Sequence, residues 1–352
     1  MTTPLLEVEG LTKHYRTGGA LGGGGRPIRA VDGVSFAIDS ATTHALVGES
    51  GSGKTTTAQM ILLLEKPTAG TIRFRGVDLG SAERHVLREY RQSVQAVFQD
   101  PYSSLNPRMR VEEIVGEPLR IHGSLRRRAL RTRVGELLDQ VGLQPKVARY
   151  FPHMFSGGQR QRIAIARALS LQPQLIVLDE PVSALDVSIR AQILNLLVDL
   201  QRDLGLTYLL ISHDLAIVEH MSHRVAVMYA GRLVETAPVD RLYAEPTHPY
   251  TSGLMAAVPN LDPDVPLRDI VGGEVANPGD LPSGCRFHPR CPLRRELGEP
   301  AICVEEDPAL LPLAPEHACA CHFRRADAPQ PAITGAQFTP ASSGTEPPTP
   351  IA

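Results

Sequence analysis

The chain has 352 residues, of which 42% are hydrophobic and 21% charged, and this composition is typical of globular rather than disordered proteins. Its formal net charge of -2 provides no overall attraction toward nucleic acid or anionic lipid. No apolar run approaches the roughly 20 residues that span a bilayer, and residues 1–10 lack the basic-then-apolar order of a secretion signal. We therefore expect a cytoplasmic protein that does not bind nucleic acid and that reaches a membrane only through a partner.

Short strands are predicted near the N-terminus, where apolar side chains alternate over residues 5–9 and 34–38. Between these strands, residues 18–25 include six glycines, which predicts a loop, most simply a tolerated surface insertion. A further apolar strand is expected at residues 44–47, and a helix is expected over residues 55–64.

Helices and apolar strands alternate farther along the chain. Most of residues 84–172 is amphipathic, which predicts an inserted helical subdomain. Apolar strands are then predicted at residues 175–178 and 208–211, on either side of a helix over residues 187–204. This order is typical of an α/β fold with a mostly parallel sheet that is covered on both faces.

The composition changes after residue 258, where prolines become frequent and all the cysteines occur. We therefore expect a main domain at residues 1–258, which includes the helical subdomain, and a small domain at residues 259–326. Residues 327–352 are rich in Pro, Ala, Thr and Ser, which predicts a disordered tail.

A phosphate-binding loop is predicted directly after the strand at residues 44–47. The loop fits G-x-x-x-x-G-K-S/T without a mismatch. Its residues are Gly48, Glu49, Ser50, Gly51, Ser52, Gly53, Lys54 and Thr55. Backbone N–H groups of such a loop and the positive end of the following helix dipole bind phosphate oxygens. We expect Lys54 to neutralise the β- and γ-phosphates of ATP, Thr55 to bind Mg²⁺, and Thr56 to lie beside them in the ATP site.

Two carboxylates follow the apolar strand at residues 175–178. Asp179 is expected to hold Mg²⁺, and Glu180 is expected to polarise the attacking water as a base. His213 follows the next predicted strand, and from that strand end it could reach the γ-phosphate. Together these residues predict an ATP-hydrolysing site.

One motif between the phosphate loop and the acidic pair is specific to a family. It consists of Phe155, Ser156, Gly157, Gly158 and Gln159. With this motif the sequence resembles the ABC ATPases, whose signature is LSGGQ, and Phe155 replaces the leucine. Small residues and a serine hydroxyl at a helix N-terminus can bind a γ-phosphate. The resemblance implies that this signature faces the phosphate loop of a second ATPase subunit.

The same resemblance assigns further residues. It implies that Tyr15 stacks on adenine, although a buried structural tyrosine is the alternative, and that Gln99 contacts Mg²⁺ and ATP. His213 matches the switch histidine. The D-loop, which crosses the dimer interface, matches Ser183, Ala184, Leu185 and Asp186. The implied fold is a P-loop NTPase of the ABC ATPase type, with a parallel core sheet, an N-terminal antiparallel β subdomain, a helical subdomain and a small cysteine-containing C-terminal extension.

A narrower resemblance, at residues 98–108, 160–167 and 246–251, is to oligopeptide and dipeptide importer ATPases of the F type. It implies ATP-driven peptide import, with the chain bound peripherally to the cytoplasmic face of the cell membrane. The implied partners are a second ATPase, such as a D-type paralogue, two transmembrane permeases and an extracytoplasmic substrate-binding protein. Import of nickel or another small solute is an alternative, and a soluble ABC ATPase acting on nucleic acid or ribosomes is a more distant one.

The five cysteines are clustered, which in a cytosolic protein favours a metal site over disulfides. Residues 285–292 resemble the C-terminal motif of the same importers, some of which hold a four-iron, four-sulfur cluster (4Fe-4S). The resemblance implies that the cluster's ligands are Cys285, Cys291, Cys303 and Cys321. Cys321 fits the family pattern better than Cys319, and a zinc site or no metal are the alternatives.

Overall fold

Two β-sheets form the framework of the chain, which a computed structural model describes for residues 3–18, 24–100, 104–123, 126–257, 272–274, 276–324 and 326. Within those residues the larger sheet has the order β11 (Leu311–Ala314), β12 (His317–Cys319), β10 (Arg232–Pro238), β9 (Arg224–Tyr229), β3 (Thr43–Val47), β8 (Thr207–Ser212), β7 (Leu175–Asp179) and β6 (Val94–Val97). The smaller, antiparallel sheet has the order β2 (Gly24–Ile38), β1 (Leu6–Gly18), β4 (Ala69–Phe74) and β5 (Val77–Asp78).

The centre of the larger sheet is parallel and buried on both faces. Strands β6, β7, β8, β3 and β9 pair in parallel, and β10, β12 and β11 continue the sheet in antiparallel fashion. Neighbouring side chains of β3 point in opposite directions, so Leu46 packs into the core beneath the smaller sheet and Val47 into the core beneath the helices. The predicted α/β fold with a parallel core sheet is confirmed.

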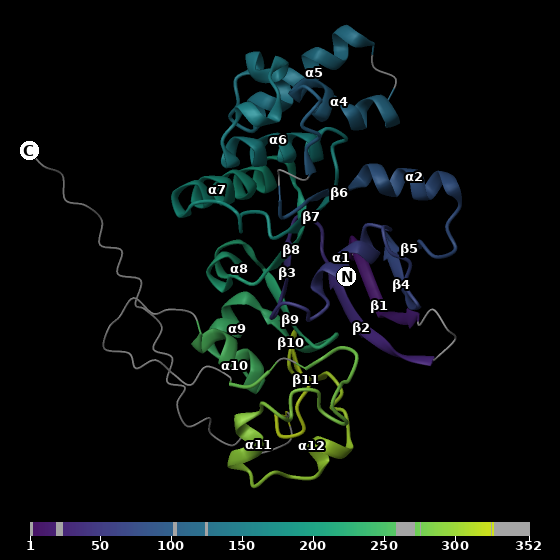
Figure 1. Cartoon of the computed structure of the whole chain (residues 1–352), viewed down its shortest axis with the longest axis vertical. Helices are drawn as coiled ribbons and strands as arrows, with labels where there is room; N and C mark the ends of the chain where they lie inside the picture. The colour runs from purple at the N-terminus through teal and green to yellow at the C-terminus, as the bar shows by residue number, and fades with distance from the viewer. Residues whose placement is uncertain are drawn as a thin grey trace, which may run out of the picture.

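Helices surround the two sheets, some along the larger sheet and others at the upper and lower ends of the molecule (Figure 1). They are α1 (Lys54–Ile61), α2 (Arg84–Ser93), α4 (Val111–His122), α5 (Arg127–Gln140), the 3-10 helices η1 (Pro145–Arg149) and η2 (Pro152–Met154), α6 (Gly157–Leu169), α7 (Val187–Leu204), α8 (Leu215–Met221), α9 (Val239–Ala244), α10 (Pro249–Ala256), α11 (Pro292–Glu296) and α12 (Ile302–Glu305). The predicted helix over residues 187–204 is confirmed by α7. The helix predicted over residues 55–64 corresponds to α1, which is shorter and ends at Ile61.

Residues 84–172 are not helical throughout. Strand β6 lies within this interval and pairs with β7, where Val94 and Val97 are buried. Four residues are too few for a periodicity to show, so only the tertiary pairing defines this strand. Helices α4, α5 and α6 lie together at the upper end of the molecule in Figure 1.

The two segments expected to be irregular are only partly described. In the predicted glycine loop, Gly18 ends β1 and Gly24 begins β2, and residues 19–23 lie outside the described residues, as do residues 101–103 of the importer-like motif. The predicted tail at residues 327–352 and the predicted domain boundary near residue 258 also lie outside them.

The cysteine-containing segment is joined to the main sheet. Strand β12 pairs with β10, with Glu235 opposite Cys319, and β11 pairs with β12. Strands β11 and β12 of the predicted small domain therefore share a sheet with strands of the predicted main domain. In the part of the chain that the structure describes, no helix has both the length and the apolar character needed to cross a bilayer.

Candidate active site

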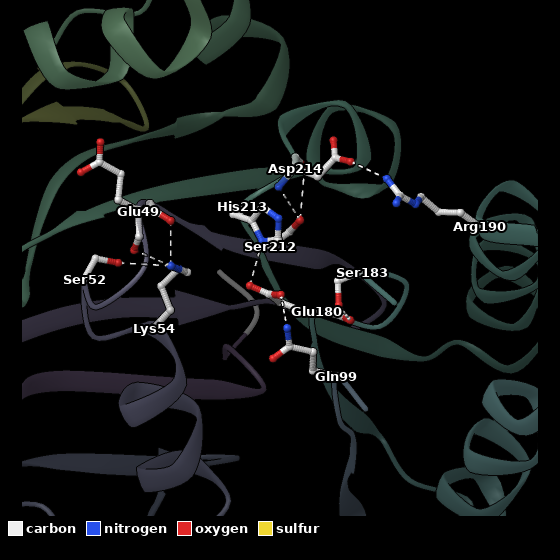
Figure 2. Close-up of polar contacts among 11 residues, drawn as sticks. Glu49, Ser52, Lys54, Gln99, Glu180, Ser183, Arg190, Ser212, His213 and Asp214 are labelled. Atoms are coloured by element: carbon white, nitrogen blue, oxygen red, sulfur yellow. Dashed lines mark hydrogen bonds and ion pairs between the residues drawn. The ribbon is translucent and has the colours of Figure 1, made fainter. Parts of the chain in front are cut away.

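The phosphate loop connects the buried strand β3 to α1. The Nζ atom of Lys54 donates hydrogen bonds to the carbonyl oxygens of Gly48 (2.7 Å) and Glu49 (2.8 Å), and it lies 3.3 Å from Oγ of Ser52 (Figure 2). Burial lowers the pKa of the Lys54 amine, whereas the nearby carboxylates, Glu180 above all, raise it. The loop therefore curls around a buried cation.

Only glycine fits at two positions of this loop. Gly48 has φ +148°, and a Cβ there would lie 2.1 Å from the carbonyl oxygen of Met228. Gly53 has φ +107°, and a Cβ there would lie 2.3 Å from the carbonyl oxygen of Ala30. The loop consequently runs tightly between β9 and β2. Of its other residues, Ser52 is buried, Ser50, Gly51 and Thr55 are exposed, and Thr56 is half-buried.

Tyr15 lies in the sheet that touches this loop. Its neighbour across the β1–β2 pair is Ile28, two residues before Ala30. The ring is half-buried, and Nζ of Lys13 lies 5.0 Å from its centroid. Lys13 therefore lies over the Tyr15 ring, and stacking of this ring on adenine stays a prediction.

Glu180, directly after β7, contacts two other predicted site residues through its carboxylate. One carboxylate oxygen accepts a hydrogen bond from Nε2 of Gln99 (2.8 Å), and the other lies 2.8 Å from Nδ1 of His213 (Figure 2). Glu180 has φ +48°, a left-handed conformation that costs energy in a non-glycine residue, and its N–H donates to the carbonyl of Ile211. The fold thus brings together three residues that were predicted from separate motifs.

Oxygen ligands suited to Mg²⁺ lie beside this carboxylate. Burial, and then the charge of Glu180, raise the pKa of Asp179 to about 6, whereas Lys54 lowers it. Nε2 of Gln99 is committed to Glu180, which leaves the amide oxygen of Gln99 for a cation. With the exposed hydroxyl of Thr55, these groups are the hard oxygen ligands that Mg²⁺ prefers.

The signature motif forms the N-terminus of α6. The Ser156 hydroxyl accepts a hydrogen bond from the N–H of Gln159, and the Gln159 side chain accepts one from the N–H of Ser156, which is a capping box. A Cβ on Gly158 would lie 2.3 Å from Ile189 of α7, and one on Gly157 would touch Leu185. Figure 1 shows α6 among the upper helices and α1 well below it, so the signature and phosphate loop of one chain lie apart.

The D-loop links the catalytic carboxylate candidate to α7. Both the N–H and the hydroxyl of Ser183 donate to the carbonyl oxygen of Glu180 (3.3 and 3.2 Å). Ala184 and Asp186 are exposed, and Leu185 is half-buried. A surface of this kind is available to a second subunit.

The prediction of an iron–sulfur cluster is wrong. Among the described residues, no group of three or more His, Cys, Asp or Glu is arranged to hold a metal ion. The four predicted ligands, Cys285, Cys291, Cys303 and Cys321, do line one cavity, but its volume of about 20 Å³ has room for little more than one water molecule. Burial also raises the pKa of the Cys285 and Cys291 thiols to about 12 and 11.

No role was assigned from the sequence to three residues: Tyr250, Arg290 and Glu235. Glu49 donates its N–H to the hydroxyl of Tyr250 (2.8 Å), and its carboxylate forms a two-pronged ion pair with Arg290 (2.7 and 2.9 Å). The fully buried carboxylate of Glu235 accepts hydrogen bonds from the backbone N–H groups of Thr247 and His248. Tyr250 and Arg290 do lie in the importer-like motifs at residues 246–251 and 285–292, which was the available signal.

Comparison with known proteins is consistent with this geometry. Residues 31–183 match the family described as ABC transporter, and residues 234–297 match the oligopeptide/dipeptide transporter C-terminal region. The probable peptide ABC transporter ATP-binding protein y4tS of Sinorhizobium fredii is 49% identical over 92% of this chain and 91% of its own length. The di/tripeptide transport ATP-binding protein DppF of Pseudomonas aeruginosa is 46% identical over 90% of this chain and 97% of its own.

Solved structures show the same fold. CbiO1 of Clostridium perfringens, part of the ABC transporter complex cbiONQ, aligns with a TM-score of 0.59 and 30% identity over 69% of this chain and 92% of its own. The ATP-binding cassette MJ0796, in a dimeric post-hydrolysis state with ADP and Pi, aligns with a TM-score of 0.59 and 29% identity over 66% of this chain and 98% of its own. The chain therefore belongs to the ATP-binding proteins of ABC transporters, in the group that carries the oligopeptide/dipeptide transporter C-terminal region.

Proposed function

We propose that this chain is the ATP-hydrolysing subunit that drives an ABC importer for di- and oligopeptides. The observation that carries the proposal is the convergence at one sheet edge of Lys54 after β3, Glu180 after β7 and His213 after β8. Ligands of parallel α/β sheets bind at the carboxyl ends of the strands, where these residues lie. The relatives named as peptide transport proteins support peptide as the cargo.

The residues of the site have separate tasks in hydrolysis. Lys54 and the N–H groups of residues 51–55 bind the phosphates, and Mg²⁺, when bound to Thr55, Asp179 and Gln99, neutralises charge on the phosphate oxygens. Glu180 accepts the proton of the attacking water, and His213 holds the carboxylate from the opposite side. Positioning and charge neutralisation supply most of the rate enhancement in this chemistry.

One chain supplies half of each of two ATP sites. Because α6, which the signature begins, and α1, which the phosphate loop begins, lie apart in Figure 1, the signature serves the nucleotide held by the phosphate loop of a second ATPase subunit. Tyr15 stacks on adenine, and the D-loop around Ala184 lies at the subunit interface. The MJ0796 cassette is itself dimeric, which supports this arrangement.

The remaining partners follow from the importer role. The chain binds two transmembrane permeases at the cytoplasmic face of the membrane, and a substrate-binding protein delivers the cargo from outside. Residues 1–258 form the ATPase domain, residues 259–326 the C-terminal domain and residues 327–352 a tail. A D-type paralogue is the second ATPase subunit.

The test is uptake by cells that lack this chain. We expect loss of uptake of radiolabelled di- and tripeptides, restoration by the wild-type gene, and no restoration by a gene carrying Lys54→Ala. Normal peptide uptake with lost nickel uptake would replace peptide by nickel as the cargo. Normal uptake of both, with the chain co-purifying with ribosomes, would contradict the importer role.

A further inference from the structure

Glu49 is the second residue of the phosphate loop, but it is held from the C-terminal region, that is, from residues 234–297. Its carbonyl oxygen accepts a hydrogen bond from Lys54, inside the loop. Its N–H donates to the hydroxyl of Tyr250 in α10 (2.8 Å), and its two carboxylate oxygens bind the guanidinium of Arg290 (2.7 and 2.9 Å). Figure 2 shows the Glu49 carboxylate pointing away from Lys54. The loop is therefore fixed at one residue by two groups from distant parts of the sequence.

Arg290 is built into its place rather than lying on the surface. Its side chain is 5% exposed, against 28% for the carboxylate of Glu49. The guanidinium carbon lies 5.7 Å from the ring centroid of Tyr229 and 5.9 Å from that of Phe287. A planar guanidinium that binds both carboxylate oxygens fixes orientation as well as charge, which lysine cannot do.

Tyr250 is fixed equally well. It is fully buried, and its ring lies 4.7 Å from that of Tyr229 and 5.4 Å from that of Phe287, measured between centroids. Its backbone N–H donates to Nδ1 of His248. The backbone N–H of His248 in turn donates to the buried carboxylate of Glu235 in β10. A chain of buried contacts thus runs from the central sheet through α10 to the phosphate loop.

We infer that Arg290 and Tyr250 are positioning residues for ATP binding, through which the C-terminal region sets the charge and shape of the phosphate loop. The inference rests on the proposed ATPase function. An unpaired carboxylate at Glu49 would repel the phosphates of ATP, whereas the pair with Arg290 neutralises that charge and holds it outside the loop. The ion pair therefore favours ATP without touching it.

Calorimetric titration of the purified full chain with ATP and Mg²⁺ tests this inference. We expect Arg290→Gln to weaken ATP binding about tenfold, because truncating one partner leaves a partly buried charge unpaired. Adding Glu49→Gln to Arg290→Gln should restore most of the affinity, since the repelling charge is then gone. A purely structural role for Arg290 would not produce this rescue. Raising the salt concentration should also reduce the defect of Arg290→Gln.

The matched control is Arg294→Gln, in the same segment. It removes the same charge and an ion pair with Glu299 (3.2 Å), which is not a residue of the phosphate loop, and should leave ATP affinity unchanged. Tyr250→Phe keeps the buried ring and removes only the hydroxyl, and it should weaken binding about threefold. This second variant decides the question if Arg290→Gln does not fold.

The outcomes separate the inference from the proposed function. Wild-type affinity in both Arg290→Gln and Tyr250→Phe would overturn the inference alone, and so would a double variant as weak as Arg290→Gln. An equal loss in Arg294→Gln would overturn it as well. Wild-type protein that binds no ATP would overturn the proposed function and the inference with it.

Discussion

The Nδ1 atom of His213 lies 2.8 Å from Oε1 of Glu180, although the two residues end different strands of the sheet. Gln99, two residues after the end of a third strand, β6, donates to the other oxygen of the same carboxylate. The left-handed backbone at Glu180 turns its side chain into this position. Because two neighbours fix the carboxylate, it is oriented before any nucleotide arrives, and such preorganisation lowers the cost of reaching the transition state.

Glu180→Gln should abolish most hydrolysis while sparing ATP binding. The amide keeps the shape and an acceptor for Gln99, but it cannot take a proton from water. We expect kcat to fall by about 10²- to 10⁴-fold, the range typical of a lost general base, in a steady-state assay of phosphate release. Glu305→Gln, at an exposed carboxylate outside the site, is the control. A wild-type rate in Glu180→Gln would exclude this residue as the base.

Lys54→Ala should weaken ATP binding by about 100-fold, because it removes a buried cation from the phosphate loop. Equilibrium titration with ATP measures the loss. Lys146→Ala removes the same charge from an exposed position in η1 and should bind ATP as the wild type does. Equal affinities of the two variants would show that Lys54 does not bind phosphate.

Asp179→Asn should change the pH dependence of stability in a defined direction. The pKa of Asp179 is raised to about 6 by burial and by Glu180, so its ionisation destabilises the folded state as pH rises from about 4 through 6. Asparagine removes this cost. The variant should therefore melt at a higher temperature than the wild type at pH 7, and the difference should disappear near pH 4. Thermal unfolding without nucleotide or Mg²⁺ measures it, and a constant difference across this range would contradict the assignment.

Glu235→Gln should destabilise the attachment of residues 247–248 and β12 to strand β10. The carboxylate accepts hydrogen bonds from two backbone N–H groups, and one of its oxygens lies 2.8 Å from Nε2 of His317 beside it on β12. An amide cannot accept all three, so a buried donor loses its partner, at a cost of about 1–3 kcal/mol. Urea denaturation measures the free energy of unfolding. Glu306→Gln, at an exposed position, should leave it unchanged.

Mixing two inactive variants tests whether this chain pairs with itself or with a paralogue. Lys54→Ala removes the phosphate loop's cation, and Ser156→Arg blocks the signature with a bulky side chain. If this chain pairs with itself, a mixed dimer contains one intact site, made from Lys54 of one chain and Ser156 of the other. The mixture should then recover up to about a quarter of wild-type hydrolysis, since half of the dimers are mixed and each has one of two sites. With a D-type paralogue as the partner, as proposed, the mixture should stay inactive, and recovery of hydrolysis would contradict that proposal.

The sequence by itself determined the parts of the site that depend on local spacing. The phosphate loop, the acidic pair and the signature were all found from short motifs, because a tight turn or a helix start needs particular residues at adjacent positions. The buried strands β3, β7 and β8 were found because fully covered parallel strands are apolar throughout.

Only the tertiary structure decided how these parts meet. It placed Gln99, 81 residues away in sequence, on Glu180, and it joined Arg290 to Glu49 across 241 residues. It also corrected the cysteine prediction, since the residue types suggested ligands while packing left a small cavity between them and, among the described residues, no group arranged to hold a metal ion. Local motifs encode local backbone geometry, whereas long-range pairs and cavity volumes arise from packing of the whole chain, which no short pattern records.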